Sequence, residues 1–100
     1  MADELTSTTF APLVGTTFEL QVEPGDALLT LHLDGTTEHR PAPGGPRQQP
    51  FTLHFLGPGG DHLPQRIYSL VHPSAGRFEI FLIPRGPRAD GRQQYDAEFN

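Results

Sequence analysis

The chain has 100 residues, no cysteine, no lysine and seven arginines, and its formal net charge is −5. A chain of this length buries one hydrophobic core, so the sequence predicts a single domain without disulfide bonds. The negative charge disfavours nucleic acid as a partner, because phosphate binding relies on lysine and arginine.

The first residues lack the positive start and the apolar stretch of a secretory signal, and no apolar run approaches the ~20 residues of a membrane helix. The sequence therefore predicts no membrane insertion and a cytoplasmic location by default, unless a larger particle carries the protein out of the cell. Residues 1–8 are polar and are expected to be flexible, which leaves residues 9–100 as a single β domain.

Residues 9–14 predict one helical turn ahead of the first strand. Thr8 or Thr9 is suited to cap this turn. Pro12 fits the first turn of a helix, and Gly15 suits a left-handed exit from it. Three apolar side chains of the turn are expected to plug one end of the domain: Phe10, Leu13 and Val14.

Beyond this turn, large apolar residues alternate with polar ones in short stretches that glycine and proline separate. Alternation at period two places every second side chain on one face of a strand. The sequence predicts six strands, at residues 16–22, 27–33, 51–56, 65–72, 77–83 and 92–99. The side chains expected to point inward are Phe18, Leu20, Val22, Leu29, Leu31, Leu33, Phe51, Leu53, Phe55, Tyr68, Leu70, Phe78, Ile80, Leu82, Tyr95, Ala97 and Phe99.

Three connections between the strands carry most of the turn residues. Residues 23–26 predict a tight turn that pairs the first two strands as a hairpin. Residues 34–50 predict a long Pro/Gly-rich loop, and residues 84–91 predict a loop that carries arginines. Because most connections are short, the predicted fold is all-β: a small antiparallel six-stranded meander, closed into a barrel or packed as a tight two-sheet sandwich, with one short N-terminal helical turn.

The strands at residues 65–72 and 77–83 are apolar on both faces. A chain of this size does not cover the second face of such a pair, and exposed apolar patches of this kind mark contact sites. The sequence therefore predicts an interaction surface on this second face. Its residues are Ile67, Val71, Phe81 and Ile83, with Arg85, Arg88 and the 40–50 stretch at the rim.

The sequence contains no recognisable catalytic or metal-binding pattern. The five histidines lack the close spacing of metal ligands, and no serine stands in a Gly-x-Ser-x-Gly elbow. The glycine-rich stretches at residues 43–46 and 57–60 precede no helical pattern, which a phosphate-binding loop requires. We therefore expect no enzymatic activity, no cofactor and no bound metal.

Five short motifs in a fixed order carry a resemblance to a known family. They are Phe10–Phe18 (FAPLVGTTF), Phe51–Phe55 (FTLHF), Tyr68–Pro73 (YSLVHP) with Gly76, Phe81–Pro84 (FLIP) and Tyr95–Asn100 (YDAEFN). Over residues 9–100 the chain resembles a small bacterial all-β family that is known as a domain of unknown function. The resemblance implies an all-β single domain, a bacterial origin and a genomic setting near phage-tail-like collar proteins, and it assigns no catalytic residue.

Two functions of different classes follow from these patterns. The first is a non-enzymatic structural or protein-interaction module that contributes surfaces to a larger bacterial, phage-tail-like protein assembly, with a protein as its partner. The alternative is a small β-barrel that binds a small-molecule ligand, lined by Tyr68, Tyr95 or His54. Seven phenylalanines are available to fill the interior of such a barrel, which favours the first function.

Overall fold

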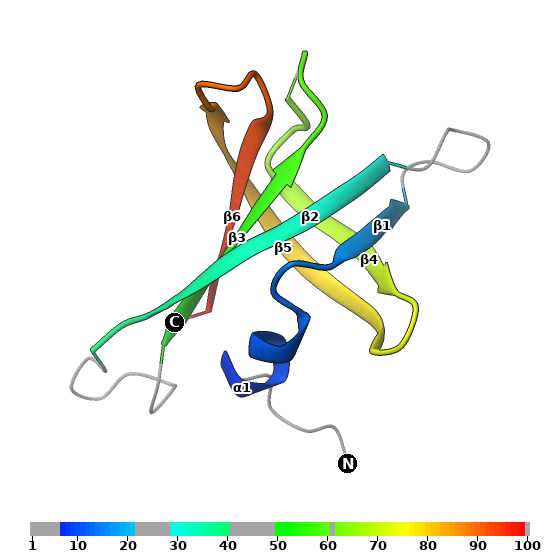
Figure 1. Cartoon of the computed structure of the whole chain (residues 1–100), viewed down its shortest axis with the longest axis vertical. Helices are drawn as coiled ribbons and strands as arrows, with labels where there is room; N and C mark the ends of the chain where they lie inside the picture. Colours follow the sequence, from blue (N-terminus) through cyan, green and yellow to red (C-terminus); the bar gives the residue numbers. More distant parts are fainter. Residues whose placement is uncertain (1–6, 22–28, 41–49, 61, 100) are drawn as a thin grey trace.

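A computed structural model describes residues 7–21, 29–40, 50–60 and 62–99. Six antiparallel strands close into a barrel, which Figure 1 shows from the side. The predicted all-β fold class is confirmed, in its barrel form. The strands are β1 (Thr17–Gln21), β2 (Leu29–Glu38), β3 (Phe51–Gly57), β4 (Arg66–His72), β5 (Gly76–Pro87) and β6 (Gln93–Phe99).

The strands follow one another around the barrel in the order β1-β2-β3-β6-β5-β4. The chain thus makes two runs of three neighbouring strands, and the runs join where β3 pairs with β6 and β4 pairs with β1. The predicted meander is wrong at one step, because β3 and β4 are consecutive in the chain but are not neighbours in the barrel. Pairing the outer strands of the two runs removes the open edges that each run would otherwise expose.

The side chains that alternate inward fill the barrel. Phe18 and Phe55 are completely buried and meet edge to face inside it, with ring centroids 5.6 Å apart. Leu29, Phe78 and Phe99 are only partly buried at the margins of the core, and the predicted core residue Val22 lies outside the described residues. The fully packed core consists of Phe10, Phe18, Leu20, Leu31, Leu33, Phe51, Leu53, Phe55, Tyr68, Leu70, Ile80, Leu82, Tyr95 and Ala97.

Two strands extend further than their hydrophobic pattern predicts. β2 continues to Glu38, so the predicted 34–50 loop begins after that residue, and β5 continues to Pro87 through half of the predicted arginine-bearing loop. In both strands the register shifts, between Leu33 and Gly35 in β2 and between Pro84 and Gly86 in β5. Such a bulge inserts an extra residue and interrupts the alternation, which therefore no longer reveals the strand.

The bulge in β5 depends on glycine. Gly86 has a φ of +100°, a conformation that residues with a side chain rarely adopt. The extra residue of the bulge, Arg85, is therefore placed on the outer surface of the barrel, where it contacts β6. The predicted tight turn at residues 23–26 lies outside the described residues.

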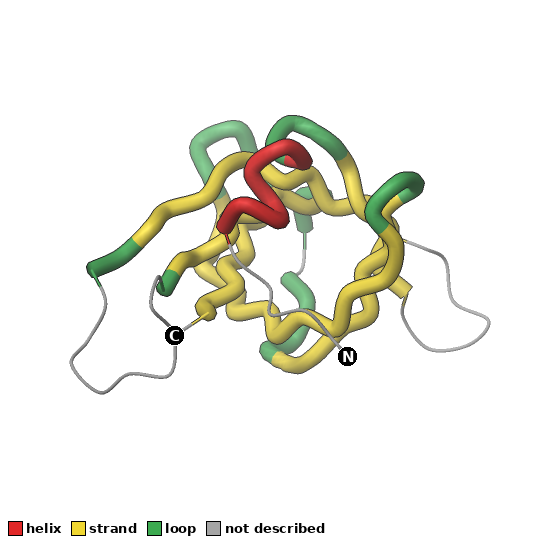
Figure 2. Tube along the Cα trace, turned by 90° about the horizontal axis from the view of Figure 1, so that it is seen from below, coloured by secondary structure: helices red, strands yellow, loops and turns green. Residues whose placement is uncertain are grey.

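The helical segment ahead of β1 comprises α1 (Ser7–Phe10) and a 3₁₀ turn, η1 (Ala11–Leu13). The predicted helical turn is confirmed, and it starts at Ser7 rather than at residue 9. Figure 2 shows the segment lying at one end of the barrel. Phe10 is completely buried there, and its ring lies 6.1 Å from that of Phe51, 5.2 Å from that of Phe78 and 6.0 Å from that of Phe99.

Of the three side chains predicted to plug this end, two do so. Phe10 is buried and Leu13 is partly buried against the core, but Val14 is 40% exposed. The prediction for Val14 is wrong because the helix ends at Leu13. Val14 takes an extended conformation (φ −60°, ψ 133°), which breaks the helical spacing that would place its side chain beside that of Phe10.

Replacement of Phe10 by alanine is expected to destabilise the fold by about 3–5 kcal/mol, because it removes a fully buried ring and leaves a cavity among three other rings. The free energy of unfolding in urea, followed by circular dichroism, measures the effect. Val14→Ala serves as the control and is expected to change the stability by less than about 0.5 kcal/mol. An equal loss for both variants would show that Phe10 does not hold the end of the barrel.

Candidate interaction surface

The outer wall formed by β4 and β5 carries an exposed apolar pair. Ile67 and Phe81 lie directly opposite each other across the two strands, and they are 61% and 44% exposed. The only other large hydrophobic residue exposed among the described residues is Val14, which follows the helical segment. The two most exposed of the four predicted apolar interaction residues thus lie side by side.

The other two predicted apolar residues of this surface occupy different positions relative to the pair. Ile83 follows Phe81 on the same face of β5, lies opposite Asp96 of β6 and is half-buried. Val71 is also half-buried, but it lies at the opposite end of β4. The predicted interaction surface is therefore divided into two areas. The larger area contains Ile67, Phe81 and Ile83, and the smaller contains Val71.

The two areas are separated by a polar pair. Ser69 lies opposite Glu79, and its hydroxyl hydrogen-bonds to the carboxylate, with both oxygens at 2.8 Å. Val71 lies beyond this pair, opposite Arg77 on one side and Glu19 on the other. Charged and polar side chains therefore border the apolar area along the strands.

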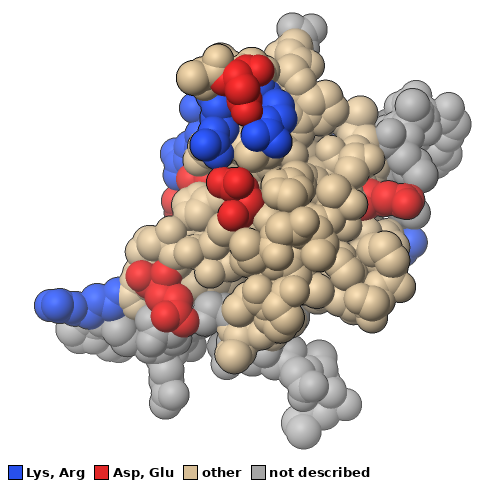
Figure 3. Space-filling model, viewed as in Figure 1, with Lys and Arg blue, Asp and Glu red and all other residues tan. Residues whose placement is uncertain are grey.

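Both predicted rim arginines make ion pairs within the chain. The Arg85 side chain contacts Asp96 at 3.0 Å and Glu98 at 2.9 Å, and Arg88 contacts Asp34 at 3.1 Å. Figure 3 shows acidic and basic side chains gathered over the loop that joins β5 to β6. The arginines thus neutralise neighbouring carboxylates while remaining about half exposed.

A row of hydrogen-bonded side chains crosses the outer wall next to the apolar area. Thr37 of β2 lies 2.7 Å from Nε2 of His54 on β3, and Nδ1 of His54 lies 2.9 Å from Asp96 on β6. Asp96 also accepts hydrogen bonds from Arg85 on β5 and from Gln94. Because an ionised carboxylate only accepts hydrogen bonds, Nδ1 of His54 is the donor in its contact with Asp96.

The environment of Asp96 favours its charged form. Burial by itself raises the pKa of the Asp96 carboxyl group. Hydrogen bonds from His54, Gln94 and Arg85 outweigh burial and hold this pKa below its ordinary value of 3.8. The carboxylate at the centre of the row is therefore ionised at neutral pH.

The order hydroxyl, imidazole, carboxylate is also that of a serine-hydrolase triad. Acyl transfer additionally needs hydrogen-bond donors that converge on the developing oxyanion. Backbone N–H groups of a strand point in the plane of the sheet, whereas Thr37, His54 and Asp96 stand on its outer surface. We therefore interpret the row as a brace that ties β2, β3, β6 and β5 together.

Sequence reasoning did not find this row, since its members are far apart in the chain. His54 and Asp96 are 42 positions apart and become neighbours through the pairing of β3 with β6. The alternation of its strand predicts an outward position for His54, and the structure places it on the outer wall, away from the ligand site that it was also considered to line. The pairing of β3 with β6 is not visible in the alternation of either strand, so only the three-dimensional register reveals the row.

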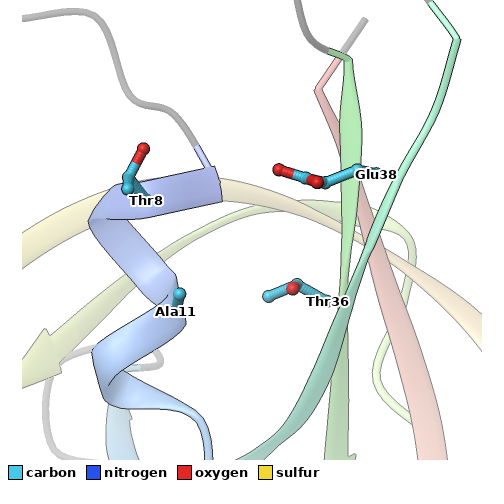
Figure 4. A pocket seen from close by; sticks show the side chains of 4 residues that line it. All are labelled: Thr8, Ala11, Thr36 and Glu38. Atoms are coloured by element: carbon cyan, nitrogen blue, oxygen red, sulfur yellow. The ribbon is translucent and has the colours of Figure 1, made fainter.

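A pocket of about 340 Å³ lies between α1 and β2 (Figure 4). It is lined by Thr8 and Ala11 of the helical segment and by Thr36 and Glu38 of β2, whose side chains extend toward the helix. The bulge in β2 turns these two residues toward the inner side of the sheet, opposite Leu53 and Phe51. The pocket lies at the end of the barrel, away from Ile67 and Phe81.

Of the residues predicted to line a ligand site, Tyr68 and Tyr95 bring their hydroxyl groups to two adjacent residues of one loop, whereas His54 lies on the outer wall. The hydroxyl of Tyr68 donates to the carbonyl of Pro64, and that of Tyr95 accepts from the N–H of Leu63. Within the described ranges, no three His, Asp or Glu side chains lie close enough together to hold a metal ion. None of the helices in those ranges is long and apolar enough to span a membrane.

Comparison with known proteins places the chain in a family. The model of the family named "domain of unknown function (DUF6916)" matches residues 5–99. The chain belongs to this family. No curated protein and no solved structure matches it. Family membership agrees with the resemblance carried by the five motifs, and it assigns neither an activity nor a partner.

The brace predicts an acid dependence of stability that Asp96 controls. Folding lowers the pKa of Asp96, so the ionised carboxylate contributes to the free energy of unfolding. This contribution is fully present above pH 3.8, the pKa in the unfolded chain, and is lost as the pH falls through the lower pKa of the folded chain. Asp96→Asn is expected to cost about 1–3 kcal/mol at pH 7, since charge-assisted hydrogen bonds are lost. The stability difference between wild type and variant is expected to narrow below pH 3.8.

Urea unfolding at several pH values between 2 and 7 measures both effects. Asp90→Asn is the matched control, because Asp90 also pairs with an arginine, Arg92, but its side chain is about half exposed, whereas that of Asp96 is largely buried. This control is expected to lose much less stability. A stability difference for Asp96→Asn that stays constant down to pH 2 would contradict the assignment of Asp96 as the charged centre of the brace.

Proposed function

We propose that this domain is a non-enzymatic protein-interaction module that contributes to a larger protein assembly, and that it binds its partner through the outer wall of β4 and β5. The observation that carries the proposal is the exposed cross-strand pair of Ile67 and Phe81. Aromatic and aliphatic side chains at the centre of a patch, bordered by polar groups, are the usual anchors of protein interfaces.

The pair is not needed to complete the interior of the barrel. The inward face of the same two strands already supplies core residues, including Tyr68, Leu70, Ile80 and Leu82. A single exposed hydrophobic residue is common on protein surfaces, but two large ones in direct cross-strand contact present a continuous apolar area. Contact with a partner would remove that area from water and so favour association.

The surroundings of the pair favour a preorganised surface. Asp96 lies opposite Ile83 and is held by His54 and Arg85 from the neighbouring strands. A surface that is already ordered loses less conformational entropy when it binds. The brace thus supports the proposed function by keeping the wall beside Phe81 in one arrangement.

The kind of assembly is inferred from the resemblance described above. Its implied bacterial origin and its implied setting near phage-tail-like collar proteins favour a phage-tail-like particle as the assembly. The domain would act there as a structural component with protein partners, in the cytoplasm or as part of a particle that leaves the cell. The small-molecule alternative has less support, because the inward-facing phenylalanines Phe18 and Phe55 pack against each other and are completely buried inside the barrel.

Substitution of both Ile67 and Phe81 by lysine is expected to weaken capture of the partner by about tenfold or more, because charges replace the apolar anchors. The measurement is quantitative affinity capture with tagged protein from the cells in which the protein is native. Both positions are exposed, so thermal unfolding is expected to occur at nearly the wild-type temperature.

Val14→Lys is the matched control, since Val14 is exposed to a similar extent as Phe81 but lies just after the helical segment, away from β4 and β5. This variant is expected to capture the same proteins as the wild type. Equal capture by the double lysine variant and by the wild type would refute a partner site on the wall of β4 and β5.

A further inference from the structure

His72 is a buried ionisable side chain that belongs neither to the brace nor to the proposed partner site. It is the last residue of β4, and its side chain is only 7% exposed. We propose that His72 is an acid-sensitive latch: the neutral imidazole holds the turn between β4 and β5 to the start of β1, and uptake of a proton releases this turn. This inference is independent of the proposed function, because it concerns a different part of the molecule.

One ring nitrogen of His72 accepts hydrogen bonds from the turn. The backbone N–H groups of Ser74 and Ala75 both donate to Nδ1, each at 3.1 Å, and the Ser74 hydroxyl lies 3.2 Å from the same nitrogen. A backbone N–H only donates, so Nδ1 carries a lone pair and no proton. The turn that leads from β4 into β5 is thus held by an acceptor on the imidazole.

The other ring nitrogen ties the same side chain to the segment ahead of β1. Nε2 of His72 lies 3.0 Å from the hydroxyl oxygen of Thr16, and this hydroxyl donates to the carbonyl of Leu13 at 2.6 Å. Because the hydroxyl has a single hydrogen, it accepts from the imidazole, and Nε2 carries the ring proton. The contacts at both nitrogens therefore require the same neutral tautomer.

Protonation of the ring is incompatible with the closed turn. A proton on Nδ1 replaces the acceptor with a donor that points at the N–H groups of Ser74 and Ala75. The imidazole also packs against the completely buried ring of Phe18, with centroids 4.9 Å apart. A charged group in such a place loses its hydration and needs a partner of opposite sign. Among the described residues, no carboxylate forms an ion pair with His72.

The charged groups on the neighbouring elements point elsewhere. The ionisable side chains closest to these contacts along β1, β2 and β5 are Glu19, His32, Asp34 and Arg77. Glu19 and Arg77 both lie opposite the residue that precedes His72, so they stand on the outer face of the sheet. His32 alternates with the buried Leu31 and Leu33 and also faces outward. Asp34 pairs with Arg88, and the helical segment contains no ionisable side chain.

Acid is therefore expected to weaken the latch. A histidine in an unfolded chain takes up a proton at about pH 6.5, whereas the closed latch excludes this proton. Below that pH the unfolded chain binds more protons than the folded chain, so the free energy of unfolding falls as the pH falls. The expected loss is up to about tenfold in the folding equilibrium constant for each pH unit. This window lies above pH 3.8, where the contribution of Asp96 begins to be lost.

Replacement of His72 by asparagine separates the acceptor from the titration. The side-chain carbonyl of asparagine accepts hydrogen bonds from the backbone of a following turn and does not titrate. Urea unfolding between pH 5 and pH 8 measures the effect. His72→Asn is expected to be less stable than the wild type at pH 8, because the contact with Phe18 is lost. This difference is expected to narrow by about tenfold or more in the folding equilibrium constant at pH 5.

His62→Asn is the matched control, because His62 is exposed and its Nδ1 contacts the carbonyl of the adjacent Leu63. This variant is expected to keep the pH dependence of the wild type. A difference between the wild type and His72→Asn that stays constant from pH 8 to pH 5 overturns the proposal.

Nuclear magnetic resonance of the wild type tests the latch without a variant. At pH 8 the ¹⁵N signals of the His72 ring are expected to be those of the neutral tautomer with its proton on Nε2. On acidification the amide signals of Ser74 and Ala75 are expected to shift together with the ring signals, while the amide of the core residue Leu31 keeps its position. A ring proton on Nδ1 at pH 8, or a charged ring at pH 5 with unchanged amide signals in the turn, refutes the latch.

Discussion

The packing of Phe10 against the ends of three strands is the contact on which the closed barrel depends. The ladder between β5 and β6 covers only Ile83–Pro87 on β5, and within the described residues the first half of β5 pairs with β4 alone. The stretch of β5 that does not pair with β6 leaves a gap between these two strands. Phe51 of β3 and Phe99 of β6 lie on one side of the gap, with their rings stacked 4.6 Å apart, and Phe78 of β5 lies on the other. The ring of Phe10 fills the space between them, so packing closes the barrel where hydrogen bonds between strands do not.

The two bulges shape the outer wall of the barrel that we propose as the binding surface. In β5, the shift at Gly86 adds Arg85 to the outer surface, from which it reaches both Asp96 and Glu98. In β2, the shift at Gly35 allows Thr37 to reach His54 on the outside. Without these shifts the outer wall would lack both ends of the brace. The arrangement beside Phe81 therefore depends on local irregularities rather than on the regular pattern of the strands.

The sequence predicts the parts of this fold that depend on local alternation. Every second residue of the strands at Phe18–Leu20 and Phe51–Phe55 is buried as expected, and the exposed side chains of Ile67 and Phe81 were identified as the second face of their strands. Contacts set by long-range register were not predictable, because the polar residues of the brace are typical of any solvated strand face. The ends of β2 and β5 were not predictable either, because the bulges interrupt the alternation of apolar and polar residues from which a strand is predicted.

The closed barrel and the exposed pair are physically linked. Every strand of the closed barrel pairs with a neighbour on both sides along part of its length, which favours binding of a partner to the walls or ends over addition of a strand. Along most of the outer surface polar side chains occupy the outward positions, as Ser69 and Glu79 do on β4 and β5. Ile67 and Phe81 depart from that rule within a wall that the brace at Asp96 holds in place. The interior of the barrel is filled by other side chains, so Ile67 and Phe81 remain on its outer surface. What such a domain binds is determined by the chemistry of this surface and not by the type of barrel.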